Sequence, residues 1–179
     1  MLSDEALVSA LARGEQRALG ELMLRYEHRL PAFIYRQTGG RDVDDIYQET
    51  WLRVLRGAKV FDSSRRFSTW LFQLAVNLCR DHHRRRVVQD RGENQARDQA
   101  AVPVPQTSNE LSAIDRRLDA QTLLGLLDER HREVVLLRCF EDMSEEQAAR
   151  VLSIPRGTVK SRMHNAIVRM AAVTKGEPG

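Results

Sequence analysis

The residues best suited to contacting a partner molecule lie at positions 67–86, in the stretch FSTWLFQLAVNLCRDHHRRR. Amides and guanidinium groups can hydrogen-bond base edges, and guanidinium groups also pair with phosphate. One side of the predicted helix carries Gln73, Asn77, Arg80 and Arg84. Apolar residues at helical spacing predict a buried face formed by Trp70, Leu71, Leu74, Ala75, Leu78 and Cys79. Alone, the stretch fits a nucleic-acid contact and a solvated surface helix equally well.

The same stretch also contains three potential metal ligands, Cys79, His82 and His83. Structural zinc takes four ligands, and no Cys-x-x-Cys pair supports these three. We therefore expect a structural cysteine beside two solvated histidines, and neither a metal ion nor another cofactor. The other cysteine, Cys139, also lies in an apolar helical pattern, so both thiols are predicted to be buried.

Composition indicates a globular protein of one large or two small domains, because the 179 residues are 42% hydrophobic and 30% charged. The net charge of +3 is small, so the distribution of charge must indicate the partner. No apolar run approaches the ~20 residues that span a bilayer. The first residues carry acids where a signal peptide carries cations. We expect a cytoplasmic protein without direct membrane insertion.

Helical spacing dominates the N-terminal half, and no alternating strand is predicted. The expected helices cover residues 4–12, 16–38, 42–55 and 67–86, with a loop at 57–66. Ser3 or Asp4 should cap the first helix. Pro31 should bend the second, because proline removes one helical hydrogen bond, and Gly39 with Gly40 should end it. The third helix has a polar face opposite its apolar one, and such a face is usually solvated.

Residues 88–110 are polar, weakly periodic and interrupted by Pro103 and Pro105. A loop of this length is unusual inside one compact domain. We therefore predict a domain at 1–87, a linker at 88–110 and a second domain at 111–179. The fold class is all-α, with an N-terminal helical bundle and a C-terminal helix–turn–helix domain joined by a flexible linker.

A helix–turn–helix pattern is predicted near the C-terminus, after helices at 111–127 and 129–140. Ser144 and Gln147 form a capping box, and the turn falls at 153–155. The following helix, 156–170, contains no acid and should fit a major groove. Its expected apolar face is Val159, Met163, Ala166, Ile167 and Met170, and the opposite face is Gly157, Lys160, Ser161, His164 and Asn165. The alternative, without DNA binding, is a plain helical hairpin within an all-α core.

Two parts of the chain resemble conserved regions of bacterial sigma factors of the extracytoplasmic-function group. The second region of that family is similar to DVDDIYQETWLRV at 42–54, FSTWL at 67–71, AVNL at 75–78 and DHHRRR at 81–86. The fourth region is similar to LDERHREV at 127–134 and IPRGTVKSR at 154–162. The resemblance covers nearly the whole chain apart from the linker.

The resemblance implies a factor that binds core RNA polymerase and directs promoter-specific transcription initiation. The N-terminal domain would dock on the β′ clamp helices and read the −10 element. The C-terminal domain would bind the β flap and read the −35 element. An anti-sigma factor is an implied partner besides polymerase and promoter DNA. Such a factor is not an enzyme, since polymerase does the chemistry.

The resemblance also implies three groups of site residues. The core polymerase surface would consist of Asp44, Asp45, Gln48, Glu49 and Arg53. The −10 contacts would come from Ser64, Arg65, Arg66, Phe67, Gln73, Asn77, Arg80, Arg84 and Arg85. Phe67 would form an aromatic wall beside a flipped base. The −35 contacts would come from Arg138, Arg156, Gly157, Thr158, Lys160, Ser161, Arg162, His164 and Asn165.

Three departures from the family pattern leave the promoter sequence open. Ser153 stands where glycine is frequent, Glu145 where an aromatic residue is common, and Tyr47 replaces a smaller apolar residue. Three other classes of function compete with the sigma factor. A repressor or activator would bind duplex DNA as a dimer without polymerase. A DNA-processing enzyme would need a nucleophile or a metal cluster, and a protein-interaction module leaves the acid-free helix unexplained.

Overall fold

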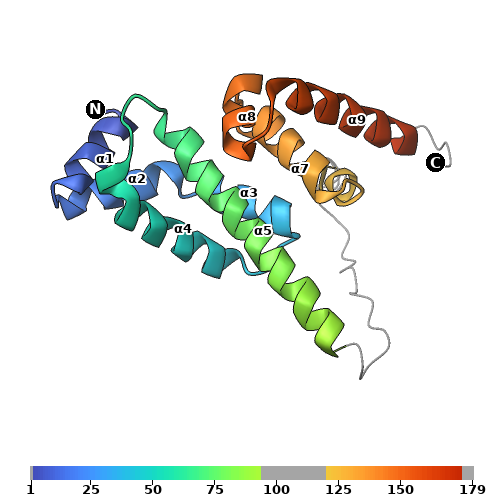
Figure 1. Ribbon diagram of the computed structural model, residues 1–179, viewed down its shortest axis with the longest axis horizontal. Helices are drawn as coiled ribbons and strands as arrows, with labels where there is room; N and C mark the ends of the chain where they lie inside the picture. The colour runs from blue at the N-terminus through green and yellow to red at the C-terminus, as the bar shows by residue number, and fades with distance from the viewer. Residues whose placement is uncertain (1, 94–119, 175–179) are drawn as a thin grey trace, which may run out of the picture.

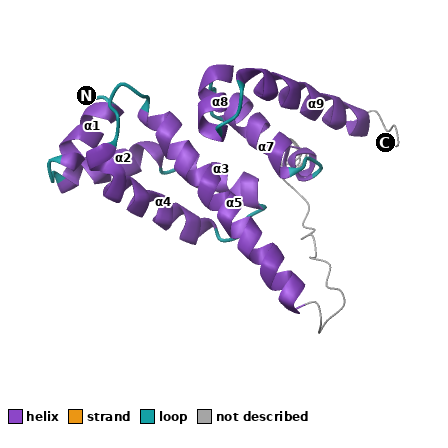
Figure 2. Ribbon diagram, in the orientation of Figure 1, coloured by secondary structure: helices purple, strands orange, loops and turns teal. Residues whose placement is uncertain are grey.

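The structure, a computed structural model, describes residues 2–93 and 120–174. Every regular element in these two ranges is a helix, which confirms the all-α prediction (Figure 1, Figure 2). The first range contains α1 (Asp4–Ala12), α2 (Gln16–Tyr26), α3 (Arg29–Thr38), α4 (Val43–Gly57), η1 (Ala58–Val60) and α5 (Phe67–Glu93). The second contains helical residues 120–125, α7 (Glu129–Val135), η2 (Leu136–Phe140), α8 (Glu145–Leu152) and α9 (Arg156–Thr174). No helix in the described ranges is long and apolar enough to cross a membrane.

The N-terminal domain is organised around α5, which packs against α1, α3 and α4 (Figure 1). An aromatic cluster fills the space between these helices. Phe72 meets Phe33 edge to face, with ring centroids 5.1 Å apart, and Phe67 meets Tyr26 at 5.6 Å. Such edge-to-face pairs add to the free energy of apolar burial. Of the face of α5 predicted to be buried, four residues lie in the core and two are partly exposed: Leu71, Ala75, Leu78 and Cys79 are buried, whereas Trp70 and Leu74 are not fully covered.

The helix predicted over 16–38 is two helices, separated by Glu27 and His28. Pro31 is the third residue of α3, within the first turn, where a missing N–H costs least. Its ring also excludes a helical hydrogen bond to the carbonyl of Glu27. The proline was correctly predicted to disturb the helix, but the helix breaks rather than bends. Gly39 ends α3 in the left-handed region as expected, with a φ of 68°.

α5 continues to Glu93, beyond the end predicted at position 86. The first residues of the predicted linker, 88–93, are therefore helical. Figure 1 shows this end of α5 projecting beyond the other helices. The remainder of the predicted linker lies outside the described residues, as does the start of the helix predicted over 111–127. The described part of that helix covers 120–125, and a turn follows it.

The predicted helix–turn–helix is present in the C-terminal domain. Ser144 accepts a hydrogen bond from the N–H of Gln147 at 3.2 Å, and the Gln147 side chain accepts one from the N–H of Ser144 at 2.8 Å. This is the expected capping box. Ser153 follows α8 in the left-handed region, with a φ of 55°. That conformation is cheapest for glycine, which explains the family's frequent choice there.

Two positions expected in the core are exposed instead. Cys139 is exposed, whereas Cys79 is buried as predicted. Residues 136–140 are wound as a π-helix, whose wider turn changes which positions face inward. Ile167 is 50% exposed. Helical rotation places it about 80° around α9 from the buried Val159, too far to reach the core.

Candidate nucleic-acid and polymerase interfaces

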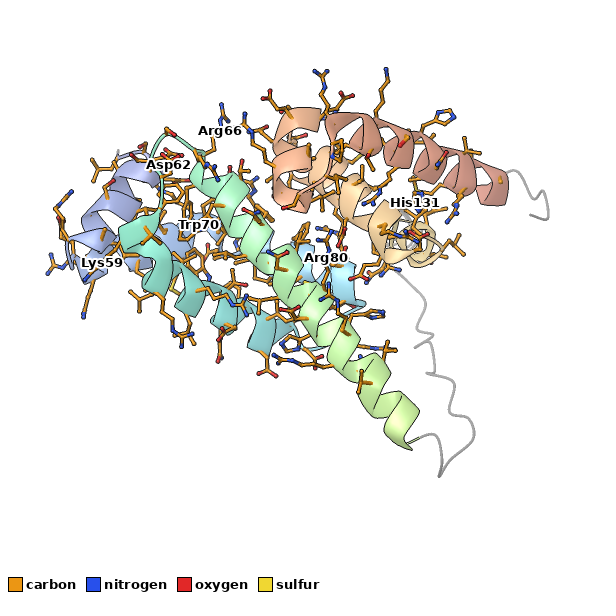
Figure 3. All side chains as sticks on the ribbon, in the orientation of Figure 1. Lys59, Asp62, Arg66, Trp70, Arg80 and His131 are labelled. Atoms are coloured by element: carbon orange, nitrogen blue, oxygen red, sulfur yellow. The ribbon has the colours of Figure 1, made fainter. Side chains whose placement is uncertain are left out.

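A cavity of about 720 Å³ lies beside the loop of residues 61–66. The loop contributes Phe61, Asp62, Ser64, Arg65 and Arg66 to its lining, and α5 contributes Thr69, Trp70 and Gln73. The far wall belongs to the C-terminal domain and consists of Gln147, Arg150 and Ser153. Figure 3 labels Asp62, Arg66 and Trp70 around this region. The cavity therefore opens where the two domains meet.

Hydrogen bonds within the loop fix its shape. The Asp62 carboxylate accepts a bond from the N–H of Ser64 at 3.0 Å, and the Asp62 carbonyl accepts one from the N–H of Arg65 at 3.0 Å. Hydrogen bonds from Ser64 hold the pKa of Asp62 below its usual range. Phe61 packs on Trp70 with ring centroids 4.8 Å apart. The loop is thus an ordered turn with two aromatic rings at its base.

The predicted role of Phe67 as an exposed aromatic wall is wrong. Phe67 is fully buried and packs against Tyr26, Phe61 and Trp70. Phe61 and Trp70 are both partly exposed and line the cavity in its place. Phe61 could have been identified from the sequence as a candidate stacking residue, because it lies in the loop and aromatic residues are rare in this chain.

The predicted polar stripe of α5 is divided between solvent and the C-terminal domain. Asn77, Arg84 and Arg85 are exposed. Gln73 instead donates a hydrogen bond to the Ser153 hydroxyl, at 3.4 Å. Arg80 forms a bidentate pair with Glu133 of α7, in which both N–O distances are 2.6 Å. Figure 3 shows Arg80 on the side of α5 that faces α7.

Two buried carboxylates of the C-terminal domain receive arginines from the N-terminal domain. Glu133 has no exposed surface, and burial raises its pKa although the Arg80 guanidinium opposes this. The side chain of Glu141 is 3% exposed and accepts a bond from Arg29 at 2.9 Å. A buried carboxylate needs such a partner, because an unpaired charge is costly in the protein interior. The two pairs therefore hold the domains together.

Arg132 of α7 adds a third interdomain link. Its guanidinium donates to the carbonyls of Leu124 and Leu127 in its own domain, and to the carbonyl of Gln37 at 3.0 Å. Gln37 lies in the last turn of α3, where carbonyls lack helical partners and a cation is favourable. The link thus satisfies a helix end across the domain boundary. The amide of Gln37 is buried and has no hydrogen-bond partner among the described residues.

The polar face of α9 is open to solvent as predicted. The exposed residues of this face are Gly157, Lys160, Ser161, His164 and Asn165. The arginines predicted to accompany them are less available. Arg156 pairs with Glu145 at 2.9 Å, Arg162 is partly buried, and Arg138 donates to the Met143 carbonyl within the domain. Thr158 is also partly buried.

The outer face of α4 combines acidic and apolar residues. Asp44, Asp45 and Gln48 are exposed, as the polar-face prediction requires. Glu49 is partly buried and pairs with Arg53 at 3.2 Å. Two leucines of this helix that were not predicted to belong to its surface are also exposed: Leu52 is 44% exposed and Leu55 is 46% exposed. Their spacing, outside the apolar face of α4, could have identified them.

Comparison with known proteins gives two family-model matches, one in each domain. The model for sigma-70 region 2 matches residues 22–88, and that for sigma-70 region 4 matches residues 117–170. The RNA polymerase sigma factor NccH of Alcaligenes xylosoxydans xylosoxydans is 34% identical over 175 residues, which cover 95% of this chain and 94% of that protein. The chain belongs to the extracytoplasmic-function sigma factors.

Two further known proteins are similar to this chain over nearly its whole length. The ECF RNA polymerase sigma-E factor of Escherichia coli strain K12 is 29% identical over 185 residues, covering 99% of this chain and 96% of that protein. The structure of CnrH in complex with the cytosolic domain of CnrY has a TM-score of 0.72 and 28% identity. It covers 98% of this chain and 99% of CnrH. Sigma factors act in transcription initiation.

In this sigma factor, α1 precedes both family-model matches, and the predicted site residues form separate surfaces. The 61–66 loop, the exposed side chains at 77, 84 and 85 of α5 and the outer face of α4 lie in region 2, and the cavity lies between regions 2 and 4. The polar face of α9 lies in region 4. Gln73 and Arg80 are the predicted DNA contacts that are already engaged by the other domain.

Proposed function

We propose that this sigma factor binds core RNA polymerase and directs initiation by reading two separate promoter elements. In this proposal, α9 reads the −35 element, and the 61–66 loop with α5 reads the −10 element. The observation that supports it best is the pairing, in one chain, of an acid-free exposed helix face with an arginine-lined cavity. The first suits duplex DNA, and the second suits an extruded base.

The exposed face of α9 can reach the base edges of a major groove. Lys160 and Asn165 carry the donors and acceptors that such readout requires, and Ser161 can contact either bases or phosphates. Arg156 is paired with Glu145, so it can contact the DNA only if a phosphate replaces that carboxylate as its partner. We assign Arg138, which is held inside the domain, a supporting role for the turn before α8.

The loop cavity is suited to a base of the separated −10 strand. Phe61 and Trp70 offer aromatic surface for stacking, while the exposed Arg65 and Arg66 offer charge to the adjoining phosphates. Extruding a base costs a few kcal/mol, so contacts made only to open DNA must offset it. Asn77, Arg84 and Arg85 continue the path of the strand along α5. Gln73 and Arg80 can join this path only after they separate from the C-terminal domain.

We assign the polymerase contact to the outer face of α4. Its exposed carboxylates and leucines suit a helical partner with basic and apolar residues, as the β′ clamp helices would provide. We also propose the domain limits 1–87 and 111–179, with 88–110 between them and the helical end of α5 entering this linker. The β flap would contact the C-terminal domain.

We further propose that an anti-sigma factor holds this chain inactive. The similarity to CnrH, whose structure contains the cytosolic domain of CnrY, supports this proposal. The interdomain contacts of Gln73 and Arg80 also support it, because they engage two predicted DNA contacts in the absence of DNA. We assign the chain no catalytic activity of its own, and a cytoplasmic location, where the polymerase acts.

Run-off transcription with purified core polymerase tests the proposal. The template pool should carry random sequence in the −35 and −10 positions, because the enriched templates then show which promoter sequence this protein selects. We expect enrichment of a two-part sequence only when this chain is present. A duplex-binding repressor or activator would instead enrich an inverted repeat without polymerase, and that result would contradict the proposal.

A further inference from the structure

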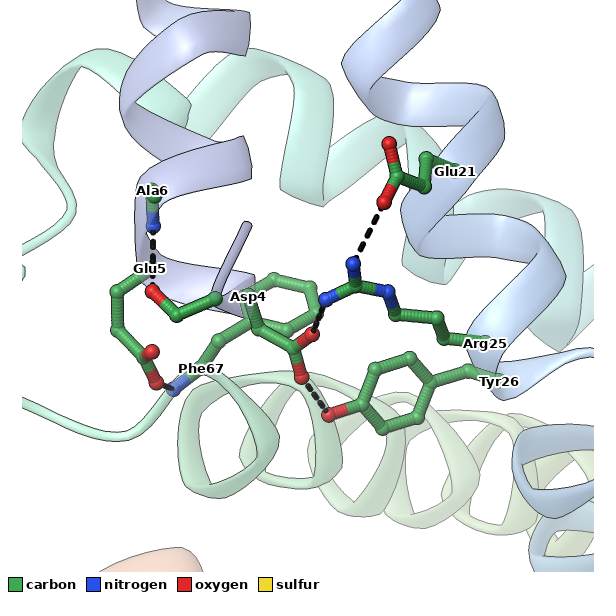
Figure 4. A network of polar contacts seen from close by, with 8 residues as sticks. Asp4, Glu5, Ala6, Glu21, Arg25, Tyr26 and Phe67 are labelled. Atoms are coloured by element: carbon green, nitrogen blue, oxygen red, sulfur yellow. Dashed lines mark hydrogen bonds and ion pairs between the residues drawn. The ribbon is translucent and has the colours of Figure 1, made fainter. Parts of the chain in front are cut away.

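α1 supplies a carboxylate to the start of α5. Glu5 Oε1 accepts a hydrogen bond from the backbone N–H of Phe67 at 2.9 Å, as Figure 4 shows. This N–H belongs to the first turn of α5 and has no partner within the helix. The first turn of α5 contains no acid, and the side chain of the preceding Arg66 has no hydrogen-bond acceptor. Glu5 therefore provides, from elsewhere in the chain, the cap that α5 lacks.

The end of α1 that carries Glu5 is held in place by α2. Asp4 accepts hydrogen bonds from Arg25 at 2.6 Å and from the Tyr26 hydroxyl at 2.5 Å (Figure 4). Glu21 holds Arg25 from its other side at 2.5 Å. Burial, with the hydrogen bond to Asp4, raises the pKa of Tyr26, so its hydroxyl remains a donor. These contacts fix the backbone next to Glu5.

The capped turn adjoins the loop that forms the cavity. Ser64, Arg65 and Arg66 line this cavity, and the same three residues line a surface depression that includes Glu5. The loop has fixed points at both ends, since Phe61 packs on Trp70 and Phe67 is held by Glu5. Releasing the Phe67 N–H would free the end of the loop that carries the two arginines.

We propose that Glu5 is a positioning residue for −10 recognition, which holds the first turn of α5 and thereby the orientation of Arg65 and Arg66. This inference rests on the proposed function of the loop. It adds that α1, which lies outside the matched region 2, holds the loop in place. Glu5 itself does not touch the DNA. Its effect depends on accepting a hydrogen bond, so an uncharged acceptor should retain most of it.

The test compares three full-length variants in holoenzyme with core polymerase. Glu5→Ala removes the acceptor, and Glu5→Gln keeps one without charge. Glu15→Ala removes an exposed carboxylate whose side chain, within the described residues, pairs only with Arg13. The probe is the single-stranded oligonucleotide that unaltered holoenzyme selects from a pool randomised over the −10 positions. Binding is measured by fluorescence anisotropy, core affinity by titration, and the Phe67 amide by hydrogen exchange.

We expect Glu5→Ala to weaken oligonucleotide binding about threefold to tenfold, as the loss of a helix cap predicts. Its Phe67 amide should exchange faster, whereas Glu5→Gln and Glu15→Ala should resemble the unaltered protein. Core affinity should not change. Equal binding by Glu5→Ala, equal loss in Glu5→Gln, or a parallel loss of core affinity would overturn the positioning role. If unaltered holoenzyme selects no oligonucleotide, the proposed −10 function fails, and the inference fails with it.

Discussion

Side chains on α9 differ in how readily they can reach DNA. Lys160 is exposed and has no partner among the described residues, whereas Arg156 already pairs with Glu145. The hydrogen bond between these two raises the pKa of Arg156 and lowers that of Glu145. Arg162 is partly buried on the side of α9 nearer Glu133. Among the basic residues of this helix, Lys160 therefore ranks first, because it is exposed and no ion pair holds it in the described part of the chain.

Lys160→Ala should weaken binding to a −35 duplex fragment about fivefold to tenfold, as the loss of one charged DNA contact predicts. If Lys160 contacts a phosphate, the slope of log affinity against log salt should also fall by about 1. The matched control is Lys59→Ala, which removes an exposed lysine in the other domain. Fluorescence anisotropy at several salt concentrations measures both quantities. Unchanged affinity would mean that another face of α9 reads the DNA.

At the scale of elements, α4 presents a continuous stripe rather than a scatter of polar residues. Asp45, Gln48, Leu52 and Leu55 follow one another at spacings of three or four, which places them on one side of a helix. Leu52 and Leu55 place two exposed apolar side chains at one end of this stripe, and Asp45 lies at the other end. The stripe thus offers both apolar and charged groups to a protein contact.

Replacing Leu52 and Leu55 together by glutamine should weaken core polymerase binding at least tenfold, since burying a leucine contributes about 1.5–3 kcal/mol. Thermal stability should change little, because both side chains are nearly half exposed already. Leu24→Gln is the control, since Leu24 is 65% exposed on α2. A titration of labelled sigma factor with core polymerase gives the affinities. If the double variant and the control bind core polymerase with equal affinity, this face of α4 does not contact the polymerase.

The helices themselves were largely predictable from the sequence, because their signals are local. The capping box at Ser144 and the glycines after α3 act within a few residues of the ends they define. The break before Pro31 was foreseen only as a bend, since one missing hydrogen bond does not reveal how far neighbouring turns separate. The buried position of Phe67 was missed because its spacing alone does not show which neighbours enclose it.

Contacts between distant segments could not be predicted from the sequence. Arg80 and Glu133 are 53 positions apart, and Arg29 and Glu141 are 112 apart. From the sequence, every arginine of α5 could have been a DNA contact. Only the packing of the two domains shows that Arg80 pairs with the buried Glu133. At the scale of the whole molecule, two residues of the candidate DNA surface, Gln73 and Arg80, therefore also lie in the interface between the domains.

Arg80→Ala should open the molecule, because it leaves Glu133 buried without a partner at a cost of about 3–5 kcal/mol. Adding Glu133→Ala should restore part of the closure, since no buried charge then remains. Arg84→Ala is the control, since it removes an exposed arginine that pairs with Asp81 of the same helix. Small-angle X-ray scattering reports the radius of gyration of each variant. The pair is not what holds the domains if Arg80→Ala remains as compact as the unaltered chain.

The second interdomain pair should make stability depend on pH. Burial raises the pKa of Glu141 to about 7, although Arg29 and Arg36 lower it, and Asp142 adds a smaller rise. A carboxyl group whose pKa is raised by folding binds its proton more tightly in the folded chain. Its contribution is fully present below the usual carboxyl range and is lost as the pH rises through about 7.

The free energy of unfolding, measured with urea, should therefore fall as the pH rises from 5 to 8. The contribution of Glu141 is up to about 1.4 kcal/mol per pH unit below its folded pKa. Glu141→Gln should remove this part of the slope, because the amide stays neutral while it can still accept a bond from Arg29. Asp142→Asn removes only the smaller rise, so this variant should keep most of the slope. Burial also raises the pKa of Glu133, which contributes to both slopes, so the decisive quantity is the difference between the unaltered chain and Glu141→Gln. If the two slopes are equal, Glu141 is ionised throughout this range, and the Arg29 pair outweighs the cost of burial.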